Sequence, residues 1–515
     1  MIAYTALQAP SPLQHLPLSS TSHYSPVILG VRRSIVIRTD PNPKNSISCS
    51  ISQVHNYGTV DYERKPVLKW NSLYRRISLM ENPELGSSTV LDQWEKEGRK
   101  LSKWVLSRVV KELRKFRRYK FALEVYEWMT NQGDRFRVAS SDAAIQLDLI
   151  SKVHGISTAE DYFSRLPETL KDRRTYGSLL NAYAQSKMRE KAENVIEEMR
   201  KKGYANHPLP YNVMMTLYMN LNEYEKANSL ISEMMEKKIP LDIYSYNIWL
   251  SSCGAMGSME KMEQVFEQMS LDGTINPNWT TYSTMATMYI KMGYFEKAKD
   301  CLKKVEIRIT GRDRMPYHYL LSLYGGIGSK EEVYRIWNKY KSNFPSIPNL
   351  GYHAMIASLV RLGDISGAEI IYEEWLSVRS NYDPRICNLL IGWYVREGSL
   401  EKAETFLSHV TEVGGKLNSN TWEIIAEGHI KKKQIVEALS CMKKASVAEG
   451  AKNWRPKLTN VSAFLSLCEE ESDIASKDAL IEVLRQVGCL ENATYKSLVS
   501  RNGRRGVDLK LSLEN

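Results

Sequence analysis

PLPYNVMMTLYMNLNEYEKANSLISEMMEKKIPLD, residues 208–242, is the clearest copy of a pattern that fills most of the chain. It contains two helical patterns separated by a short turn, and then the pattern begins again. An aromatic residue returns at intervals of 35 or 36 residues: Tyr176, Tyr211, Tyr246, Tyr282, Tyr317 and Tyr352. Two further steps of 35 residues reach Cys387, where the aromatic is lost, and Trp422. A helical pattern with so long a fixed period predicts an all-α solenoid superhelix.

The second helix of this segment carries an apolar stripe that suits packing between repeats. Ala227, Leu230, Ile231 and Met234 recur at three- and four-residue spacing, which places them on one helix face. A small side chain in such a stripe lets paired helices approach closely. Alanine stands at the matching place in other copies: Ala122, Ala192, Ala298, Ala368, Ala403 and Ala438.

The period divides the chain into four predicted parts. Residues 1–50 differ in composition from the rest, and residues 51–102 contain an N-terminal helical cap. Residues 103–457 form an array of about ten helix-turn-helix repeats of about 35 residues each. Residues 458–515 contain a degenerate repeat that caps the array, followed by a C-terminal tail.

Residues 1–50 have the composition of a transit peptide. They hold twelve Ser and Thr, four basic residues and a single acid, Asp40, and the first charge is Arg32. A mitochondrial presequence is expected to place arginines on an early amphipathic helix, whereas prolines at 10, 12, 17 and 26 oppose a helix here. We therefore predict a chloroplast address. A mitochondrial address and a tail without an address are the alternatives.

Composition favours an anionic partner and gives no sign of catalysis. The 515-residue chain has a net charge of +11, and no apolar run approaches a membrane span. Its seven cysteines form no CxxC pair, which indicates buried free thiols rather than a metal site. Neither an HExxH spacing nor a phosphate-binding glycine loop is present. We expect no enzyme activity, no metal and no cofactor.

The repeat resembles a known family at its most regular residues. The pattern is Tyr-Asn, then a hydrophobic helix, Gly, a second helix with Ala and Met, and then Pro-(x)-Asp; PLD at 240–242 and NPN at 276–278 are close to this ending. This pattern resembles the pentatricopeptide repeat, of the plain class built from 35-residue copies and typical of plant organelles. The resemblance covers roughly residues 103–457. The structural competitor is a 34-residue tetratricopeptide array, which the sustained 35-residue step disfavours.

The resemblance implies binding of single-stranded RNA, about one base per repeat. In the family, the residue after the first-helix aromatic and the last residue of the repeat choose the base. Transferred to this chain, they give a preference of U-Y-G-n-n-Y, read 5′ to 3′ along residues 208–418. The implied base-reading residues are Asn212, Asp242, Asn247, Asn278, Ser283, Asp313, His318, His353, Asp383, Asn388 and Asn418.

The resemblance also implies residues that stack on bases, two places before the aromatic. Thr280 and Arg385 depart from the family's aliphatic pattern at this place. Packing between neighbouring repeats is the alternative role for the whole set. The implied stacking residues are Leu209, Tyr244, Met315 and Leu350.

Phosphates require cations, and four cations recur at the end of the first helix. Solvated helix ends explain the same pattern without RNA. A denser basic run at 99–120 contains ten cations and one acid, so it is either a landing surface for RNA or the solvated face of a capping helix. The candidate phosphate contacts are Lys291, Arg361, Arg396 and Lys431.

These features favour a sequence-selective single-stranded RNA-binding protein of organellar RNA metabolism. It would act in transcript stabilisation, processing, splicing or translation, as a monomer without a membrane span. Other RNA-processing or ribosomal proteins are further possible partners. The alternative is an α-solenoid scaffold that grips a protein without RNA specificity.

Overall fold

The computed structural model describes residues 69–500, apart from residues 81, 312, 380, 449–450 and 452–453. The predicted transit peptide and the end of the C-terminal tail lie outside the described residues. The chain divides into two compact units, one ending at Gly293 and one beginning at Tyr294. This division falls between two helices of one predicted repeat, 279–313. The two units are described separately.

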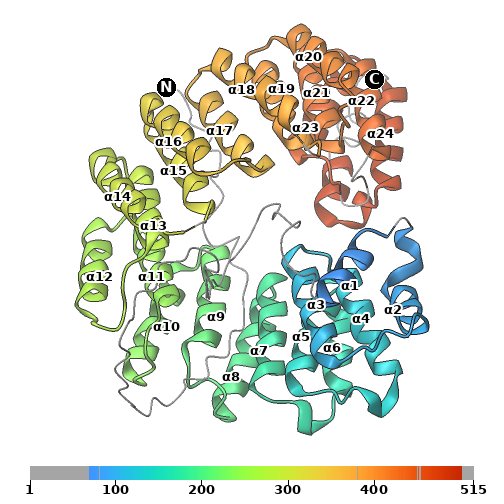
Figure 1. Ribbon diagram of the computed structural model, residues 1–515. Helices are drawn as coiled ribbons and strands as arrows, with labels where there is room; N and C mark the ends of the chain where they lie inside the picture. Colours follow the sequence, from blue (N-terminus) through green and yellow to red (C-terminus); the bar gives the residue numbers. More distant parts are fainter. Residues whose placement is uncertain are drawn as a thin grey trace, which may run out of the picture. The chain divides into compact units, whose positions relative to one another are not determined.

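The first unit consists of helices in its described residues (Figure 1). Short 3₁₀ turns at Pro83–Leu85, Gly133–Arg135 and Glu168–Leu170 connect some of them. The α-helices are α1 (Lys69–Ser78), α2 (Gly86–Lys96), α3 (Lys103–Lys115), α4 (Tyr119–Asn131), α5 (Ser140–Val153), α6 (Ile156–Arg165), α7 (Arg173–Gln185), α8 (Arg189–Lys201), α9 (Pro208–Asn220), α10 (Tyr224–Glu236), α11 (Ile243–Ala255), α12 (Met259–Leu271) and α13 (Trp279–Lys291).

The second unit continues the same pattern of helices in the part that the structure describes. A 3₁₀ turn at Cys489–Glu491 follows its last labelled helix. The α-helices are α14 (Phe295–Ile307), α15 (Met315–Ile327), α16 (Lys330–Asn343), α17 (Asn349–Arg361), α18 (Ile365–Val378), α19 (Pro384–Arg396), α20 (Leu400–Glu412), α21 (Ser419–Lys431), α22 (Ile435–Val447), α23 (Leu458–Glu470) and α24 (Ile474–Gln486).

Helices pair in chain order, and the pairs stack through their first helices. In the first unit α7 contacts α5 and α9, and α11 contacts α9 and α13, while each also contacts its own second helix. In the second unit α15, α17, α19, α21 and α23 contact one another in the same sequence. The prediction of an all-α solenoid of helix-turn-helix repeats is confirmed.

The periodic tyrosine and the periodic alanine are buried in the helix pairs that carry them. Tyr211 on α9 is completely buried, and the tyrosines at the matching places are at most 6% exposed. Ala227 on α10 is 1% exposed, and the six alanines at the same place in other second helices have no exposed surface. Both residues therefore belong to the packed interior of the array.

Tyrosine hydroxyls add polar links between helices. Tyr211 donates to Glu233 Oε1 on its own second helix at 3.0 Å. Tyr218 reaches back to Glu193 Oε1 of the preceding pair at 3.0 Å. Because the rings are buried, these carboxylates satisfy hydroxyl groups that would otherwise lack a partner.

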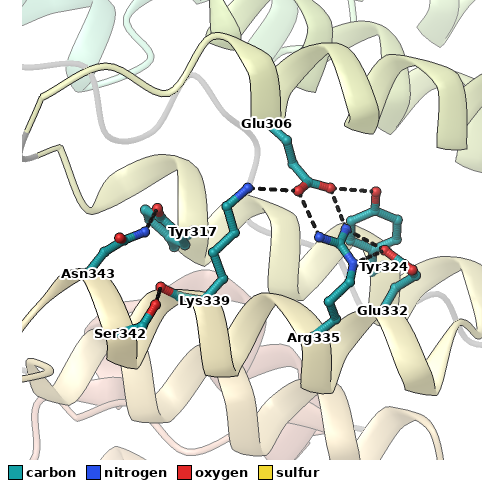
Figure 2. A network of polar contacts seen from close by, with 8 residues as sticks. All are labelled: Glu306, Tyr317, Tyr324, Glu332, Arg335, Lys339, Ser342 and Asn343. Carbon is teal, nitrogen blue, oxygen red and sulfur yellow. Dashed lines mark hydrogen bonds and ion pairs between the residues drawn. The ribbon is translucent and has the colours of Figure 1, made fainter.

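Glu306 is the centre of such a link in the second unit (Figure 2). Its carboxylate on α14 accepts from the Tyr324 hydroxyl of α15 at 3.1 Å. On α16, Arg335 Nη1 and Lys339 Nζ donate to Oε2 at 3.0 and 3.2 Å. Burial opposes ionisation, but the hydrogen bonds from Arg335 and Lys339 hold the pKa of Glu306 below its usual range. The cluster therefore joins three consecutive helices.

Among the described residues, no helix is long and apolar enough to cross a membrane. The six cysteines among these residues are all buried. Within the described residues, no three His, Cys, Asp or Glu side chains lie close enough together to hold a metal ion.

Close packing in the first unit predicts a sharp difference between two glycines. A Cβ added at Gly254 on α11 would lie 2.3 Å from Met288 Cγ and 2.6 Å from Met288 Cβ on α13, whereas one at Gly177 on α7 would meet nothing within 4 Å. We expect Gly254→Ala to lower the free energy of unfolding by about 1–3 kcal/mol. Gly177→Ala, the control, should raise it by up to about 1 kcal/mol because alanine favours helix. Denaturant titration measures both, and an equal effect of the two changes would contradict the packing argument.

Candidate nucleic-acid interface

The second residue of several first helices is exposed although the residue after it is buried. Leu209 on α9 is 45% exposed, Tyr244 on α11 is 50% exposed, and Leu350 on α17 is 45% exposed. Each lies two residues before a buried tyrosine. Met315 on α15 is partly exposed. An exposed apolar side chain at a repeated place provides a surface on which a flat ring can stack.

Asn212 and Asp242 lie in direct contact. Asn212 Nδ2 donates to Asp242 Oδ1 and Oδ2 at 3.0 and 3.2 Å. Asp242 is also the N-cap of α11, where its Oδ1 accepts from the Ser245 N–H at 2.8 Å. The Ser245 hydroxyl donates to Asn212 Oδ1 at 2.8 Å. The carboxylate that ends the repeat and caps the next helix thus fixes the amide of its own repeat.

Asn247 and Asn278 are joined through a third residue. Asn247 Nδ2 donates to Thr280 Oγ1 at 3.2 Å. The Thr280 hydroxyl and N–H both donate to Asn278 Oδ1, the N–H at 3.0 Å. Asn278 also caps α13 through the Thr281 N–H at 3.2 Å. Asn247 Oδ1 is buried and has no hydrogen-bond partner among the described residues.

The second unit repeats the direct contact at one place. Asn388 Nδ2 donates to Asn418 Oδ1 at 3.3 Å. Asn418 caps α21 and accepts from the Thr421 N–H at 2.9 Å. Three of the implied pairs, those of Asn212, Asn247 and Asn388, are therefore brought together directly or through one side chain.

The residues of the pair Ser283 and Asp313 belong to different units. Ser283 is buried, and its hydroxyl has no partner within the described part of the chain. Asp313 Oδ1 accepts from the Met315 N–H at 3.0 Å, near the start of α15. Their proposed joint role in base reading stays a prediction.

The two histidines at reading positions are held neutral by burial. His318 Nε2 lies 2.9 Å from the Tyr340 hydroxyl of α16. Burial, helped by the charge of Arg314, lowers the pKa of His318 to about 3. Burial and the charge of Arg385 also lower the pKa of His353. Neither imidazole is therefore available as a cation at neutral pH.

Asp383, the implied partner of His353, is engaged elsewhere. Its carboxylate accepts from Arg385 Nη2 at 2.6 Å and from the Arg385 N–H at 3.1 Å, so it caps α19. Arg385 is exposed but tied to this carboxylate. The free stacking surface that an arginine can offer is reduced at this repeat.

Glu423 follows Trp422 of the periodic series, so it occupies a base-reading position, but its role there is structural. It is 3% exposed and accepts from Trp454 Nε1 at 2.9 Å, from the Lys457 N–H at 2.5 Å and from Asn460 Nδ2 at 3.3 Å. These contacts fasten the segment before α23 onto α21. Packing at the C-terminal end of the repeats therefore explains why Glu423, an acid, stands at a base-reading position.

The four predicted phosphate contacts are the last residues of α13, α17, α19 and α21, and all four are exposed. A cation at this place is also favoured by the helix dipole. Arg361 Nη1 donates to the Ser322 carbonyl at 3.2 Å, and Lys431 Nζ lies 3.1 Å from Glu427 Oε1. These two are partly engaged within the protein.

The basic run at 99–120 is partly neutralised. Lys103 lies 2.5 Å from Asp142, and Arg114 lies 3.1 Å from Asp148. Three further members, Arg99, Lys115 and Lys120, have acid partners within 4.0 Å. The run therefore serves partly to join helices, while exposed members such as Lys111 still face solvent.

Sequence reasoning missed one exposed ring. Trp104 is the second residue of α3, the same place as Leu209 on α9, and it is 61% exposed. Arg108 lies with its guanidinium carbon 5.7 Å from the Trp104 ring centroid. The aromatic series does not extend to this repeat because Leu106 takes the place of the tyrosine. The repeat spacing would have revealed this stacking position, because Trp104 lies two residues before Leu106.

Stacked helix pairs with a polar side chain after five of the six periodic tyrosines define a helical-repeat protein with a potential contact in most repeats. The profile of the PPR repeat family matches residues 210–255. The single PPR repeat matches residues 174–204, 244–274, 280–307, 352–378 and 385–414. Pentatricopeptide repeat-containing protein At1g02150 of Arabidopsis thaliana is 61% identical over 503 residues, 98% of this chain and 96% of its own length. The chain belongs to the pentatricopeptide repeat family.

Other relatives carry more specific names. The mitochondrial pentatricopeptide repeat-containing protein At4g01990 of A. thaliana is 34% identical across 87% of this chain and 89% of its own length. Large ribosomal subunit protein mL101 (rPPR4) of A. thaliana is 39% identical across 80% of this chain and 84% of its own. The solved structure of maize PPR10 matches at 17% identity and a TM-score of 0.39, across 70% of this chain and 61% of that chain.

The buried imidazole of His318 predicts a pH-dependent loss of stability. The pKa of His318 falls to about 3 in the folded chain, against about 6.5 when unfolded. The unfolded state therefore binds more protons, and stability decreases as the pH falls below about 6.5. At pH 5 this difference amounts to about 2 kcal/mol. His318→Gln should reduce the loss between pH 7 and pH 5 by this amount in denaturant titrations. Equal losses in both proteins would contradict the assignment.

Proposed function

We propose that this pentatricopeptide repeat protein binds single-stranded RNA with sequence selectivity. The observation that supports this most directly is the contact of Asn212 with Asp242, beside exposed Leu209. An amide fixed by a carboxylate presents hydrogen-bonding groups in one orientation, which favours one base edge over another. An exposed aliphatic side chain three residues earlier supplies a stacking surface for the same base.

The proposed nucleotide preference remains U-Y-G-n-n-Y along residues 208–418. Its U rests on Asn212 with Asp242, and its two Y positions rest on Asn247 with Asn278 and Asn388 with Asn418. The undefined positions correspond to the repeats of His318 and His353. Exposed Lys291 and Arg396 at helix ends would contact phosphates.

We propose that the protein acts passively in organellar RNA metabolism, through transcript stabilisation, processing, splicing or translation. Composition of residues 1–50 favours the chloroplast, whereas the names of several relatives, such as At4g01990, favour the mitochondrion. Incubating the labelled full chain with isolated chloroplasts and mitochondria distinguishes these addresses. Protection from added protease in only one organelle identifies it.

A protein scaffold is the second candidate, because one relative is named as a ribosomal subunit protein. In that case the exposed faces of the first helices would bind a ribosomal partner. The salt dependence of the binding affinity distinguishes the two functions. RNA binding through several phosphates weakens steeply between low and physiological salt, whereas a hydrophobic protein contact does not.

Replacing the reading amide tests the RNA-binding proposal. Asn212→Ala removes the side chain that Asp242 orients, and we expect RNA affinity to fall about fivefold or more, the worth of one hydrogen bond or slightly more. Glu198→Ala, at an exposed place on α8, is the control and should leave affinity unchanged. Filter binding to RNA selected by the full chain measures both. Equal affinity of the wild-type protein for every homopolymer would refute sequence selectivity. Equal affinity of the wild-type and Asn212→Ala proteins for the selected RNA would refute the role of Asn212.

Trp104 extends the proposed stacking surface to the first repeat. Base stacking on an aromatic ring contributes about 1–3 kcal/mol, so Trp104→Ala should weaken RNA binding by at least about fivefold. Trp104→Phe keeps a ring and should retain most of the affinity. Unchanged binding after Trp104→Ala, with the thermal stability of the wild type, would limit the interface to later repeats.

A further inference from the structure

We propose that α1 and α3 form a second RNA-binding face, which holds single-stranded RNA outside the proposed core without selecting its bases. This α1–α3 face consists of Trp104, Arg108 and Lys111 on α3, with Trp70 of α1 beside them. The inference rests on the proposed RNA-binding function and deepens it. It assigns a role to the cap helix and to the basic run, which precede the repeats that carry the proposed core.

One stripe of α3 differs from the same stripe of a regular repeat. Trp104, Arg108 and Lys111 follow one another at four- and three-residue spacing, which places them on one side of the helix. All three are exposed. On α9, the places of Trp104 and Arg108 are taken by Leu209 and Val213, and Val213 is only 7% exposed. The place that is apolar and buried on α9 therefore carries an exposed cation on α3.

Two indole rings lie beside the Arg108 guanidinium. Its central carbon lies 5.6 Å from the Trp70 ring centroid and 5.7 Å from the Trp104 ring centroid. Such cation–π contacts restrain the side chain without neutralising its charge. No acid and no hydrogen-bond acceptor engages Arg108 among the described residues. An exposed guanidinium of this kind can donate pairs of hydrogen bonds to a phosphate.

Neutralisation within the basic run leaves this face charged. Of the ten cations at 99–120, five have acid partners within 4.0 Å. The single acid of the run, Glu112, lies 3.8 Å from Lys115 rather than beside the face. The cations that have no acid partner in the described part of the chain are all exposed: Lys100, Arg108, Lys111, Arg117 and Arg118.

The repeats that follow this face offer little for reading a base. Counted from the N-cap of each first helix, the place of Asn212 on α9 is taken by Ala144 on α5 and by Gly177 on α7. Neither side chain has a hydrogen-bond donor or acceptor. On α3 the same place holds Ser107, whose hydroxyl both donates and accepts and so excludes no base edge. Stacking and phosphate contacts remain, and these act on any nucleotide.

The chemistry of the face favours single-stranded RNA over an acidic protein segment. Trp104 is 61% exposed, so one ring face is offered next to two cations. A single strand supplies flat bases and phosphates together, whereas an acidic peptide supplies charge without a flat partner for the indole. Double-stranded RNA keeps its base faces stacked inside the helix.

Extended forms of the RNA that the full chain selects test this inference. The proposed core is read 5′ to 3′ from residue 208 onward and α3 precedes it, so an unstructured tract is added to the 5′ end. We expect the affinity to rise about fivefold or more, the worth of one stacked base, and equally for U, C and A tracts. The same tract at the 3′ end should change the affinity by less than about twofold.

Variants of the face should remove this gain and part of the salt dependence. Trp104→Ala combined with Arg108→Gln should reduce the gain to below about twofold. Arg108→Gln and Lys111→Gln should each lower the slope of log affinity against log salt concentration by about 0.7, the value of one phosphate contact to a single strand. Arg108→Lys keeps the charge and should keep the slope. Lys201→Gln, which removes the same charge from an exposed place on α8, is the control and should change neither quantity.

The outcomes separate this inference from the proposed function. If the selected RNA gains nothing from either tract, or if the gain survives in the folded double variant, the inference fails and the proposed function stands. A gain confined to one base, or an equal effect of Lys201→Gln and Arg108→Gln, would also overturn the inference. If the folded wild-type chain selects no RNA, both fail. The replaced side chains are exposed, so we expect wild-type thermal stability, which circular dichroism checks.

Discussion

The burial of one tyrosine in each regular first helix is the contact on which both the fold and the proposed site depend. Tyr211 is completely buried and reaches Glu233 of its own second helix. Since an α-helix turns about 100° per residue, fixing this ring against the second helix fixes the direction of every other side chain on the first. Leu209, two residues earlier, is then exposed, and Asn212, one residue later, accepts a hydrogen bond from Ser245 of the next repeat.

Helix capping connects consecutive repeats. The last residue of a repeat is the N-cap of the following first helix, as with Asp242 for α11, Asn278 for α13 and Asn418 for α21. A short polar side chain is needed there to satisfy free backbone N–H groups. The same side chain lies beside the reading amide of its own repeat, as with Asp242 and Asn212. One residue thus stabilises a helix and orients a possible RNA contact, so its identity is constrained twice.

The same register position can also be used for packing alone. Glu423 follows Trp422 as Asn212 follows Tyr211, yet it is buried under Trp454 and binds the backbone of Lys457. His318 lies beside the hydroxyl of Tyr340 and is kept neutral by burial. In both cases the polar side chain is bound by a partner from another helix or from a later segment. A side chain at this periodic position can therefore contact a base only where its neighbours leave it available.

The sequence by itself determined the helical repeat, its period and the register of Tyr211, Asn212 and Asp242, because amphipathic spacing and capping are local properties of the chain. It did not determine which polar atoms would remain open. Asn212 and Asn247 are the same residue at the same register, yet Ser245 engages the oxygen of one and no described group engages the oxygen of the other. Only the tertiary structure decided this. The hydrogen-bonding partner of each amide lies 33 residues away, on the first helix of the next pair. Whether that partner reaches the amide depends on side-chain packing.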